Sequence, residues 1–262
     1  MRIIGESSGV IAVWKPAGLA TQAPPAIESA ESWLRRRLHG EARRGYLGVP
    51  HRLDRAVSGV VLFAATPRAA RKLSRQFERR QVRKTYRAIV ACGPDSGPHV
   101  AALELAASEI ASRDGAASTP AVDAGSPAGS VRWEDLVLKI PDEARTRLAA
   151  VGEPQAREAI TSARLLRRPS ADWLLLELEP VTGRMHQLRL QAAARGMPML
   201  GDDVYGGADR AWVVPPPAAG VADLRAAPIA LHAARITYAD PDTGAAVTIE
   251  APLPDYWPLT AR

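Results

Sequence analysis

The sequence predicts an α+β fold with a mainly antiparallel mixed sheet flanked by helices. Short β-branched runs outnumber helical patterns, and most connections between them are too short for the helical crossovers that join parallel strands. Apolar residues make up 47% of the 262 residues, which is enough for a large buried core. We therefore expect one compact domain over residues 1–262.

Three strands are expected in the first part of the chain. Residues 9–14 and 57–65 are short, β-branched and bounded by turn residues, which is typical of buried central strands. Residues 84–91 alternate with period two, so Tyr86 and Arg87 should lie on opposite faces of a third strand.

A helix is expected from Thr66 to about position 81. Thr66 is a suitable cap, and Pro67 suits the first helical position. The apolar face of this helix recurs at Ala70, Leu73 and Phe77. Its other face is rich in arginine.

The second half of the chain begins with a segment of unusual composition. Gly, Pro, Ala and Ser dominate residues 93–130, and we expect these residues to form a flexible surface excursion. Regular structure should return at about Val131. The further expected elements are a strand at 171–180, a helix at about 185–195 and a terminal hairpin of strands 230–238 and 245–252.

Charge is distributed unevenly along the chain, whose net charge is +6. Residues 31–87 hold 16 Lys and Arg against 4 Asp and Glu, a local net charge of +12, so the rest of the chain sums to −6. This asymmetry indicates a face that binds a polyanion such as nucleic acid. A solvated basic surface that favours solubility would give the same count.

The composition excludes several classes of protein. Cys92 is the only cysteine, which excludes an internal disulfide and a thiolate cluster for zinc or iron–sulfur, and fits a reducing cytoplasm. The chain does not begin with a basic segment and a sustained apolar run, and no run of eighteen apolar residues follows. We therefore expect neither export nor a membrane span.

Four segments combine charged residues with apolar surroundings. They are AVWKPAGL (12–19), HRLDRAVSG (51–59), KTYRAIV (84–90) and TGRMHQLRLQ (182–191), the last followed by PMLGDDVYGG (198–207). Asp54 lies among arginines immediately before a hydrophobic strand, where a carboxylate stays ionised and available as a nucleophile. Taken alone, such a string is more often a structural ion pair.

In this order, the segments resemble the RluA-type family of pseudouridine synthases over nearly the whole chain. The strongest matches are HRLD with an SG-containing strand at 51–61 and TGR-x-HQ-L-R with a downstream GD-xx-YG at 182–206. LHAARI (231–236) and EAPLP (250–254) resemble the closing strands of that family. The resemblance implies the pseudouridine synthase catalytic fold. It also implies a reaction in which uracil, in ribosomal or transfer RNA, is detached from the ribose C1′, rotated and rejoined through C5.

The resemblance implies three catalytic residues. The family's essential aspartate matches Asp54, and the basic residue that pairs with it matches Arg189. The family tyrosine matches Tyr86, whose ring would stack on uracil and whose hydroxyl would serve in proton transfer at C5. We expect Asp54 to form or stabilise the intermediate after glycosidic cleavage. The sequence leaves open whether it attacks the sugar, attacks the uracil or removes a sugar proton.

Six further residues are expected to bind substrate. By resemblance, Arg52 fills the space vacated by a flipped uridine and Leu200 packs against the base, while His51 contacts the RNA backbone. Phosphate contacts near the start of the 185–195 helix are expected from Arg184, His186 and Gln187. Lys15 belongs to a motif with a structural role and a minor phosphate role.

Three positions depart from the family pattern. Met185 replaces a threonine or serine, Gln191 stands where histidine is common, and Ala56-Val57 replaces Asp-Thr. These changes remove hydroxyl or charged groups near the expected site, so we expect narrower substrate choice or weaker activity.

Other functions are alternatives at this point. A chain that kept the fold but lost turnover would be an RNA-binding or ribosome-assembly protein. A deaminase needs zinc and C-x-x-C spacing, which one cysteine excludes, and a glycosidase needs a second carboxylate near Asp54. We expect an isomerase that acts on RNA without cofactor or metal, as a cytoplasmic monomer and without a separate amino-terminal RNA-binding module.

Overall fold

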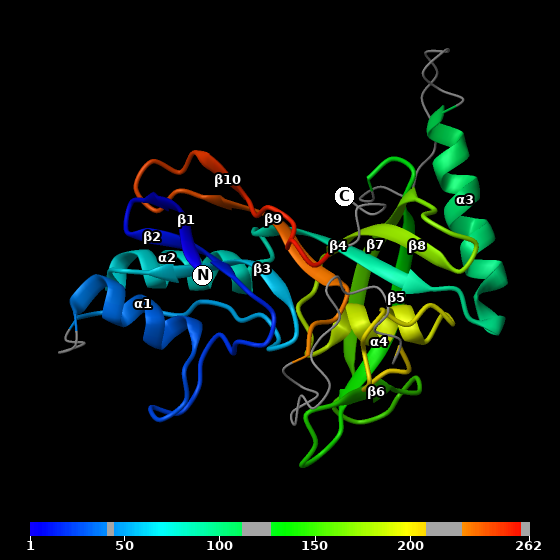
Figure 1. Ribbon diagram of the computed structural model, residues 1–262, viewed down its shortest axis with the longest axis horizontal. Coiled ribbons are helices and arrows are strands. Elements are labelled where there is room, and N and C mark those ends of the chain that lie inside the picture. The colour runs from blue at the N-terminus through cyan, green and yellow to red at the C-terminus, as the bar shows by residue number, and fades with distance from the viewer. Residues whose placement is uncertain (41–44, 112–126, 208–226, 258–262) are drawn as a thin grey trace. The chain divides into compact units, whose positions relative to one another are not determined.

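The computed structural model describes residues 1–40, 45–111, 127–207 and 227–257. It has the expected α+β class, with mostly antiparallel strand pairs (Figure 1). The chain divides into two compact units: unit 1 comprises Met1–Thr85 and Val214–Tyr256, and unit 2 comprises Tyr86–Val213 and Trp257–Arg262. The single domain expected over residues 1–262 stays a prediction.

Unit 1 is built on strands in the order β1-β2-β3-β9, with β10 paired to β9. The pairs are antiparallel except β3 and β9, which run parallel. The elements of this unit are β1 (Arg2–Ser7), β2 (Val10–Lys15), α1 (Ala30–His39), β3 (Ser58–Ala64), α2 (Pro67–Glu78), β9 (Leu231–Ala239) and β10 (Ala246–Glu250). Every residue of β3 is buried, and β2 and β3 are both interior strands. The predicted central strands and the terminal hairpin are therefore confirmed.

The predicted cap of α2 is confirmed. Thr66 Oγ1 accepts a hydrogen bond of 3.1 Å from the backbone N–H of Ala69, and Pro67 occupies the first turn. The helix ends at Glu78, about three residues earlier than expected.

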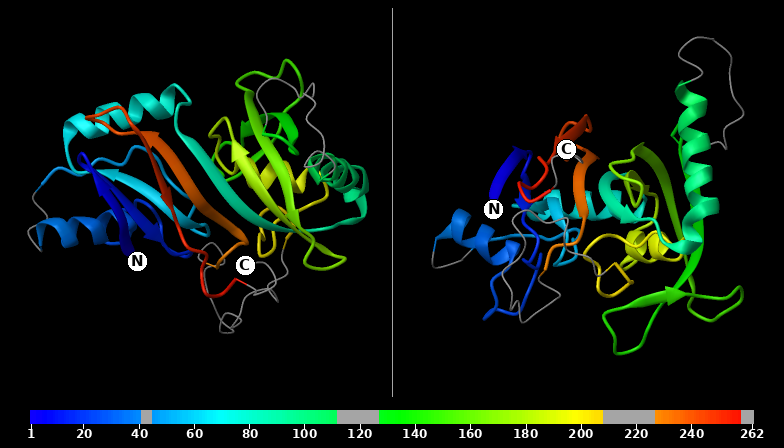
Figure 2. Two further views of the ribbon diagram at one scale, coloured as in Figure 1. Left: turned by 90° about the horizontal axis from the view of Figure 1, so that it is seen from above. Right: turned by 45° about the vertical axis from the view of Figure 1, so that its right-hand side comes forward.

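The buried face of α2 differs from the expected one. The residues buried on this helix are Ala69, Leu73 and Gln76, whereas Ala70 and Phe77 are half-buried. Gln76 is buried because its amide donates to Ala239 O and accepts from Ala239 N, both at 2.8 Å, at the end of β9. Helix α2 lies beside β9 in the fold of unit 1 (Figure 2). A polar side chain that pairs with strand backbone in this way gives no apolar signal in the sequence.

Helix α1 was not expected because little of it is apolar or buried. Ala30 and Leu34 are its buried residues, and its capping box uses Ser32 at the position where Glu or Gln usually signals a helix start. The side chain of Ser29 and the backbone N–H of Ser32 are 3.1 Å apart, and the reciprocal bond is 2.9 Å.

Strands β3 and β9 approach each other closely at the SG of the HRLDRAVSG segment. Ser58 pairs with His232 and Gly59 with Ala233. The buried His232 ring lies between Ser58 Oγ (2.8 Å from Nδ1) and the Ala251 carbonyl (3.1 Å from Nε2). Because a carbonyl only accepts, Nε2 donates to the Ala251 carbonyl. The LHAARI and SG segments are thus joined by side chains as well as by backbone.

Unit 2 contains strands in the order β4-β8-β7-β5-β6, all antiparallel. Its elements are β4 (Arg83–Ala91, which begins in unit 1), η1 (Pro94–Ser96), α3 (Gly97–Ala111), β5 (Val131–Lys139), β6 (Thr146–Leu148), β7 (Arg157–Arg167), β8 (Trp173–Pro180) and α4 (Gln187–Ala193). The strands expected at 84–91 and 171–180 and the return of regular structure at Val131 are confirmed. Strand β7 was missed because its buried residues run consecutively, without period two.

The expected excursion at 93–130 is wrong for its first half. Residues 97–111 form α3, which packs against β7 and β5 (Figure 1). Alanine, which suggested low complexity there, is also the strongest helix former, and Val100 and Leu103 are buried. Residues 112–126 lie outside the described part of the chain.

Helix α4 is shorter than the expected 185–195 and begins at Gln187. His186 precedes it with φ of 53°, a left-handed conformation that is uncommon for a residue other than glycine. Gly196, with φ of 68°, follows the helix as expected for a stop signal. Within the described ranges, no helix combines the length and the apolar character that a membrane crossing requires.

Gly59 has no room for a side chain, so a substitution there tests how closely β3 and β9 are paired. An added Cβ would lie 2.5 Å from Ala233 N and closer still to the Ala233 carbonyl oxygen, at a φ of 125°. We expect Gly59→Ala to lower the free energy of unfolding by about 3 kcal/mol or more, because backbone must move and the conformation is strained. Urea denaturation measures this change.

The matched control is Gly152→Ala, at a φ of 83° with no atom within 4 Å of the added Cβ. It should lower the free energy of unfolding by only about 1–2 kcal/mol, from backbone strain alone. Equal losses of unfolding free energy in the two variants would show that β3 and β9 are not closely packed at Gly59.

Candidate active site

Asp54 lies in unit 1, on the loop that leads into β3, and its neighbours are fixed through their backbone. The Thr21 hydroxyl donates to Leu53 O and accepts from Leu53 N, both at 3.0 Å. On the other side, Gly18 N donates to Arg55 O at 2.8 Å, and Arg55 Nε donates to Gly18 O at 2.9 Å. The carboxylate is half-buried between these two fixed residues.

A buried lysine joins the same two segments. Lys15 is fully buried, and its Nζ lies 2.9 Å from Pro16 O, 2.7 Å from Leu19 O and 3.4 Å from Arg55 O. Burial lowers the pKa of Lys15 to about 7, although the negative charge of Asp54 acts in the opposite direction. The minor phosphate role expected for Lys15 is wrong, because its amine is enclosed by carbonyl oxygens. The sequence correctly indicated its structural role.

His51 and Arg52 have opposite environments. The backbone N–H of Leu62 donates to His51 Nε2 at 2.9 Å, and the imidazole stacks on Phe77 with ring centroids 4.6 Å apart. Burial, and then the nearby charge of Lys84, lower the pKa of His51 to about 3, so the ring is neutral. His51 thus anchors the loop to α2, whereas Arg52 is exposed.

In unit 2, Arg189 forms a buried bidentate ion pair with Asp202. Arg189 Nε and Nη2 each lie 2.7 Å from a different oxygen of Asp202, and the two side chains are 7% and 0% exposed. Asp202 also accepts from the backbone N–H of Val204 at 3.1 Å. Two parallel charge-assisted bonds fix the plane of the guanidinium.

Tyr205 covers this ion pair. The guanidinium carbon of Arg189 lies 5.3 Å from the centroid of the Tyr205 ring. The Tyr205 hydroxyl accepts from Thr146 N at 3.0 Å and lies 3.2 Å from His186 Nδ1. The tyrosine also packs against the apolar cluster of Val137, Ala159 and Leu190. The GDDVYG turn therefore orients Arg189 from two directions.

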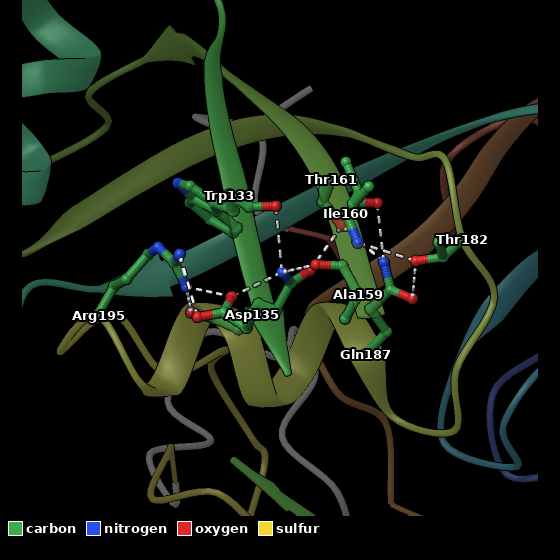
Figure 3. A network of polar contacts seen from close by, with 9 residues as sticks. Trp133, Asp135, Ala159, Ile160, Thr161, Thr182, Gln187 and Arg195 are labelled. Carbon is green, nitrogen blue, oxygen red and sulfur yellow. Dashed lines mark hydrogen bonds and ion pairs between the residues drawn. The ribbon is translucent and has the colours of Figure 1, made fainter. Parts of the chain in front are cut away.

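Two glutamines, Gln187 and Gln191, attach α4 to neighbouring strands of unit 2. Figure 3 shows Gln187 with its partners Ile160, Thr161 and Thr182. Gln187 Nε2 donates to Ile160 O and Thr161 Oγ1, both at 3.0 Å, and its Oε1 accepts from Thr182 Oγ1 at 2.7 Å and Arg184 N at 3.0 Å. Both amide donors of this buried residue are used, so the structure gives Gln187 a supporting role in place of the expected substrate contact.

Gln191 occupies the position where the family pattern commonly has histidine. It is fully buried, donates to Asp135 Oδ2 at 2.7 Å and Ala159 O at 3.1 Å, and accepts from Thr161 Oγ1 at 2.7 Å. These three partners are labelled in Figure 3. Arg195 completes the network with an ion pair of 2.9 Å to Asp135. Gln191 is therefore part of the helix–sheet interface of unit 2.

The other expected site residues of unit 2 differ in exposure. Tyr86 and Arg184 are half-buried, and Arg184 Nε donates to Glu158 O at 3.0 Å. Leu200 is 1% exposed and donates from its backbone to Ile89 O at 3.1 Å. Leu200 is a core residue here, as its hydrophobic pattern alone would have indicated.

The site residues thus fall into two groups, one in each unit. His51, Arg52 and Asp54 share one loop of unit 1, whereas Tyr86, Arg184, His186, Gln187, Arg189 and Leu200 belong to unit 2. The pairing of Arg189 with Asp54 stays a prediction. Sequence analysis missed the roles of Asp202 and Tyr205, although the GDDVYG string was the available signal. In the described ranges, no three His, Cys, Asp or Glu side chains gather as metal ligands would.

Known proteins resemble this chain over most of its length. The sequence profile of the family described as RNA pseudouridylate synthase matches residues 9–194. The "Dual-specificity RNA pseudouridine synthase RluA" of Haemophilus influenzae is 30% identical over 252 residues, 95% of this chain and 91% of that protein. The "Ribosomal large subunit pseudouridine synthase C" of Rickettsia bellii is 30% identical over 258 residues, 97% of this chain and 69% of that protein.

Solved structures agree in fold. The human protein "RNA Pseudouridylate Synthase Domain Containing 4" matches with a TM-score of 0.64 at 21% identity, covering 97% of this chain and 89% of its own. The RluA-type resemblance and the predicted fold are confirmed. The chain therefore belongs to the RNA pseudouridylate synthase family, whose members are isomerases that convert uridine in RNA to pseudouridine.

Proposed function

We propose that this chain converts specific uridines of ribosomal or transfer RNA to pseudouridine, with Asp54 as the catalytic carboxylate. The observation that carries the proposal is the fixed loop around Asp54. Both neighbours of this residue are held through their backbone, by Thr21 on one side and Gly18 on the other. A half-buried carboxylate held in this way is preorganised for attack or for charge stabilisation.

The choice of RNA class is supported by the relatives. Their names include a dual-specificity RNA enzyme, a ribosomal large subunit enzyme and the "tRNA pseudouridine synthase C" of Pectobacterium carotovorum, which is 31% identical over 214 residues. The basic excess within residues 31–87, a local +12, supports a polyanionic substrate.

The isomerisation exchanges one bond to the ribose for another. The N1–C1′ bond breaks, Asp54 forms or stabilises the intermediate, and C1′ is rejoined to C5 of the rotated uracil. C5 then loses its proton and N1 gains one, so the reaction is balanced without a redox partner. Tyr86 would stack on the uracil and serve in the proton transfer.

Access to the uridine requires that it leave the RNA stack. Arg52 is exposed and lies two residues before Asp54, so its side chain is free of the core and supports the expected role in the vacated space. His51 holds the same loop to α2 through Leu62 N–H and Phe77, which limits the loop's movement during flipping.

Asp54→Asn tests the proposed nucleophile. The amide keeps the shape but loses the charge, and we expect pseudouridine formation to fall by roughly 1000-fold or more, about 4 kcal/mol of transition-state stabilisation. Unmodified ribosomal and transfer RNA transcripts are incubated with each protein, and pseudouridine is mapped by chemical derivatisation and reverse-transcription stops.

Asp142→Asn is the matched control, because Asp142 is exposed and has a φ of 59° that asparagine also adopts. It should keep wild-type activity. If wild type and Asp54→Asn modify no transcript but bind RNA equally, the proposal fails and the alternative of a non-catalytic RNA-binding protein is favoured.

The Arg189–Asp202 pair provides a second prediction, which separates folding from function. Asp202→Asn removes one charged partner from the buried guanidinium of Arg189, and we expect it to lower the free energy of unfolding by roughly 3 kcal/mol. Arg189→Met in the same chain removes the buried guanidinium itself, while the amide oxygen introduced at position 202 can still accept from Val204 N–H. The double variant should therefore recover most of the lost stability.

Pseudouridine formation should stay at least roughly 100-fold below wild type in the double variant, because Arg189 is proposed to pair with the catalytic carboxylate. Thermal unfolding and the transcript assay are run on the same preparations. Recovery of activity together with stability would show that Arg189 has only a structural role.

A further inference from the structure

We propose that Arg71, Arg75 and Arg79 form a phosphate-binding stripe along α2 and its carboxyl-terminal cap, which holds the backbone of the RNA substrate outside the active site. The inference rests on the proposed function for the identity of the polyanion. It adds a second, sequence-independent contact surface to the residues expected near the target uridine.

The three arginines share one side of the helix. They recur every four residues, so successive side chains lie about 6 Å apart along the axis and turn only slightly around it. All three are exposed, on the side away from the buried Leu73. The stripe thus presents three guanidinium groups to solvent in a row.

The stripe lacks internal counter-charges. Within the described residues, no ion pair or hydrogen bond engages the guanidinium groups of Arg71, Arg75 and Arg79. Other basic residues of α2 are engaged: Arg68 pairs with Asp242 at 3.1 Å, and Lys72 donates to Pro241 O. The arginines of the stripe are therefore a distinct subset of this helix.

Helix α1 provides an internal comparison. Its Arg35 pairs with Glu31 at 2.9 Å and its Arg36 with Glu28 at 2.5 Å. Both helices are basic, but only α1 neutralises most of its charge within the protein. Glu78 is the one carboxylate of α2.

Like charges four residues apart oppose helix formation by about 0.2–0.5 kcal/mol per pair. The stripe contains two such pairs, Arg71–Arg75 and Arg75–Arg79, and only the arginines near the carboxyl end interact favourably with the helix dipole. An arrangement that is unfavourable for the isolated helix is accounted for by a bound polyanion, which would supply the missing negative charges.

The stripe is connected to the Asp54 loop within unit 1. Phe77 of α2 stacks on His51, three residues before Asp54, and Arg52 is exposed on the same loop. A rigid contact therefore joins the helix that carries the stripe to the loop that carries the proposed nucleophile. RNA fits the stripe better than an acidic protein does, because phosphates suit guanidinium groups in an evenly spaced row.

The test replaces all three arginines by glutamine, which keeps helix propensity. The control replaces Lys139, Arg145 and Arg157, which are exposed residues of unit 2, also by glutamine, so that net charge falls equally. Binding of an unmodified transfer RNA transcript is measured between about 50 and 200 mM KCl. The slope of log K against log salt should fall by about 2–3 for the α2 variant, with roughly 10-fold or greater loss of affinity.

The slope of the control variant should match that of wild type, and neither variant should unfold below the wild-type temperature. An unchanged slope in the α2 variant, or an equal fall in both variants, would overturn the proposal. The proposal would also be overturned if the α2 variant lost binding to poly-glutamate but still bound the transcript, because that result would indicate an acidic protein partner. Pseudouridine formation by wild type is measured in a separate assay. If wild type forms no pseudouridine but the slope falls in the α2 variant, the proposed function is rejected and the phosphate-binding role of the stripe is retained.

Discussion

The buried ammonium of Lys15 is the constraint on which the geometry of the Asp54 loop depends. Its Nζ is shared among Pro16 O, Leu19 O and Arg55 O, so one side chain joins the end of β2 to the segment beyond Asp54. An ammonium has three donors, and three carbonyl oxygens satisfy them. Burial alone lowers the Lys15 pKa, and the carboxylate of Asp54 opposes that change. The charge of the lysine and the charge of the proposed nucleophile therefore stabilise each other.

Unit 2 uses buried polar groups for a different purpose. The Arg189–Asp202 pair and the amides of Gln187 and Gln191 fix α4 in register with the turn after it and the strands below it. Such groups are unfavourable to bury unless every partner is present, so they tolerate few alternative packings. Gln191 departs from the family pattern but fits this network, since its amide donates to Asp135 and Ala159 O and accepts from Thr161.

Much of the fold could be predicted because local signals agreed with the final structure. Thr66-Pro67 marked the start of α2, period two marked β4, and continuous β-branched residues marked β3. The two misses have different physical causes. Helix α3 was hidden because alanine serves both helices and low-complexity segments, and the burial of Gln76 depends on backbone that lies more than 160 residues away.

The candidate site was predictable only through motif order. Asp54 could be selected from HRLD, but the clamps by Lys15 and Thr21 depend on contacts across 32 to 40 residues. The role of Asp202 could not be read from spacing either, because thirteen residues and the end of a helix separate it from Arg189. For Leu200 the motif was the poorer guide. It suggested a side chain that packs against the base, whereas the hydrophobic pattern correctly predicted a buried residue.

The pairing of β3 with β9 also has a consequence for biosynthesis. These strands are neighbours in unit 1, yet the chain between them contains nearly all of unit 2. The paired strands are far apart in the sequence, so this pairing has high contact order. The entropy of closing the intervening loop is lost before the contact can stabilise the fold. A ribosome that has produced Asp54 must therefore add well over 150 residues before Gly59 can meet Ala233. During that interval β3 lacks one of its two neighbouring strands, so one of its edges stays unpaired.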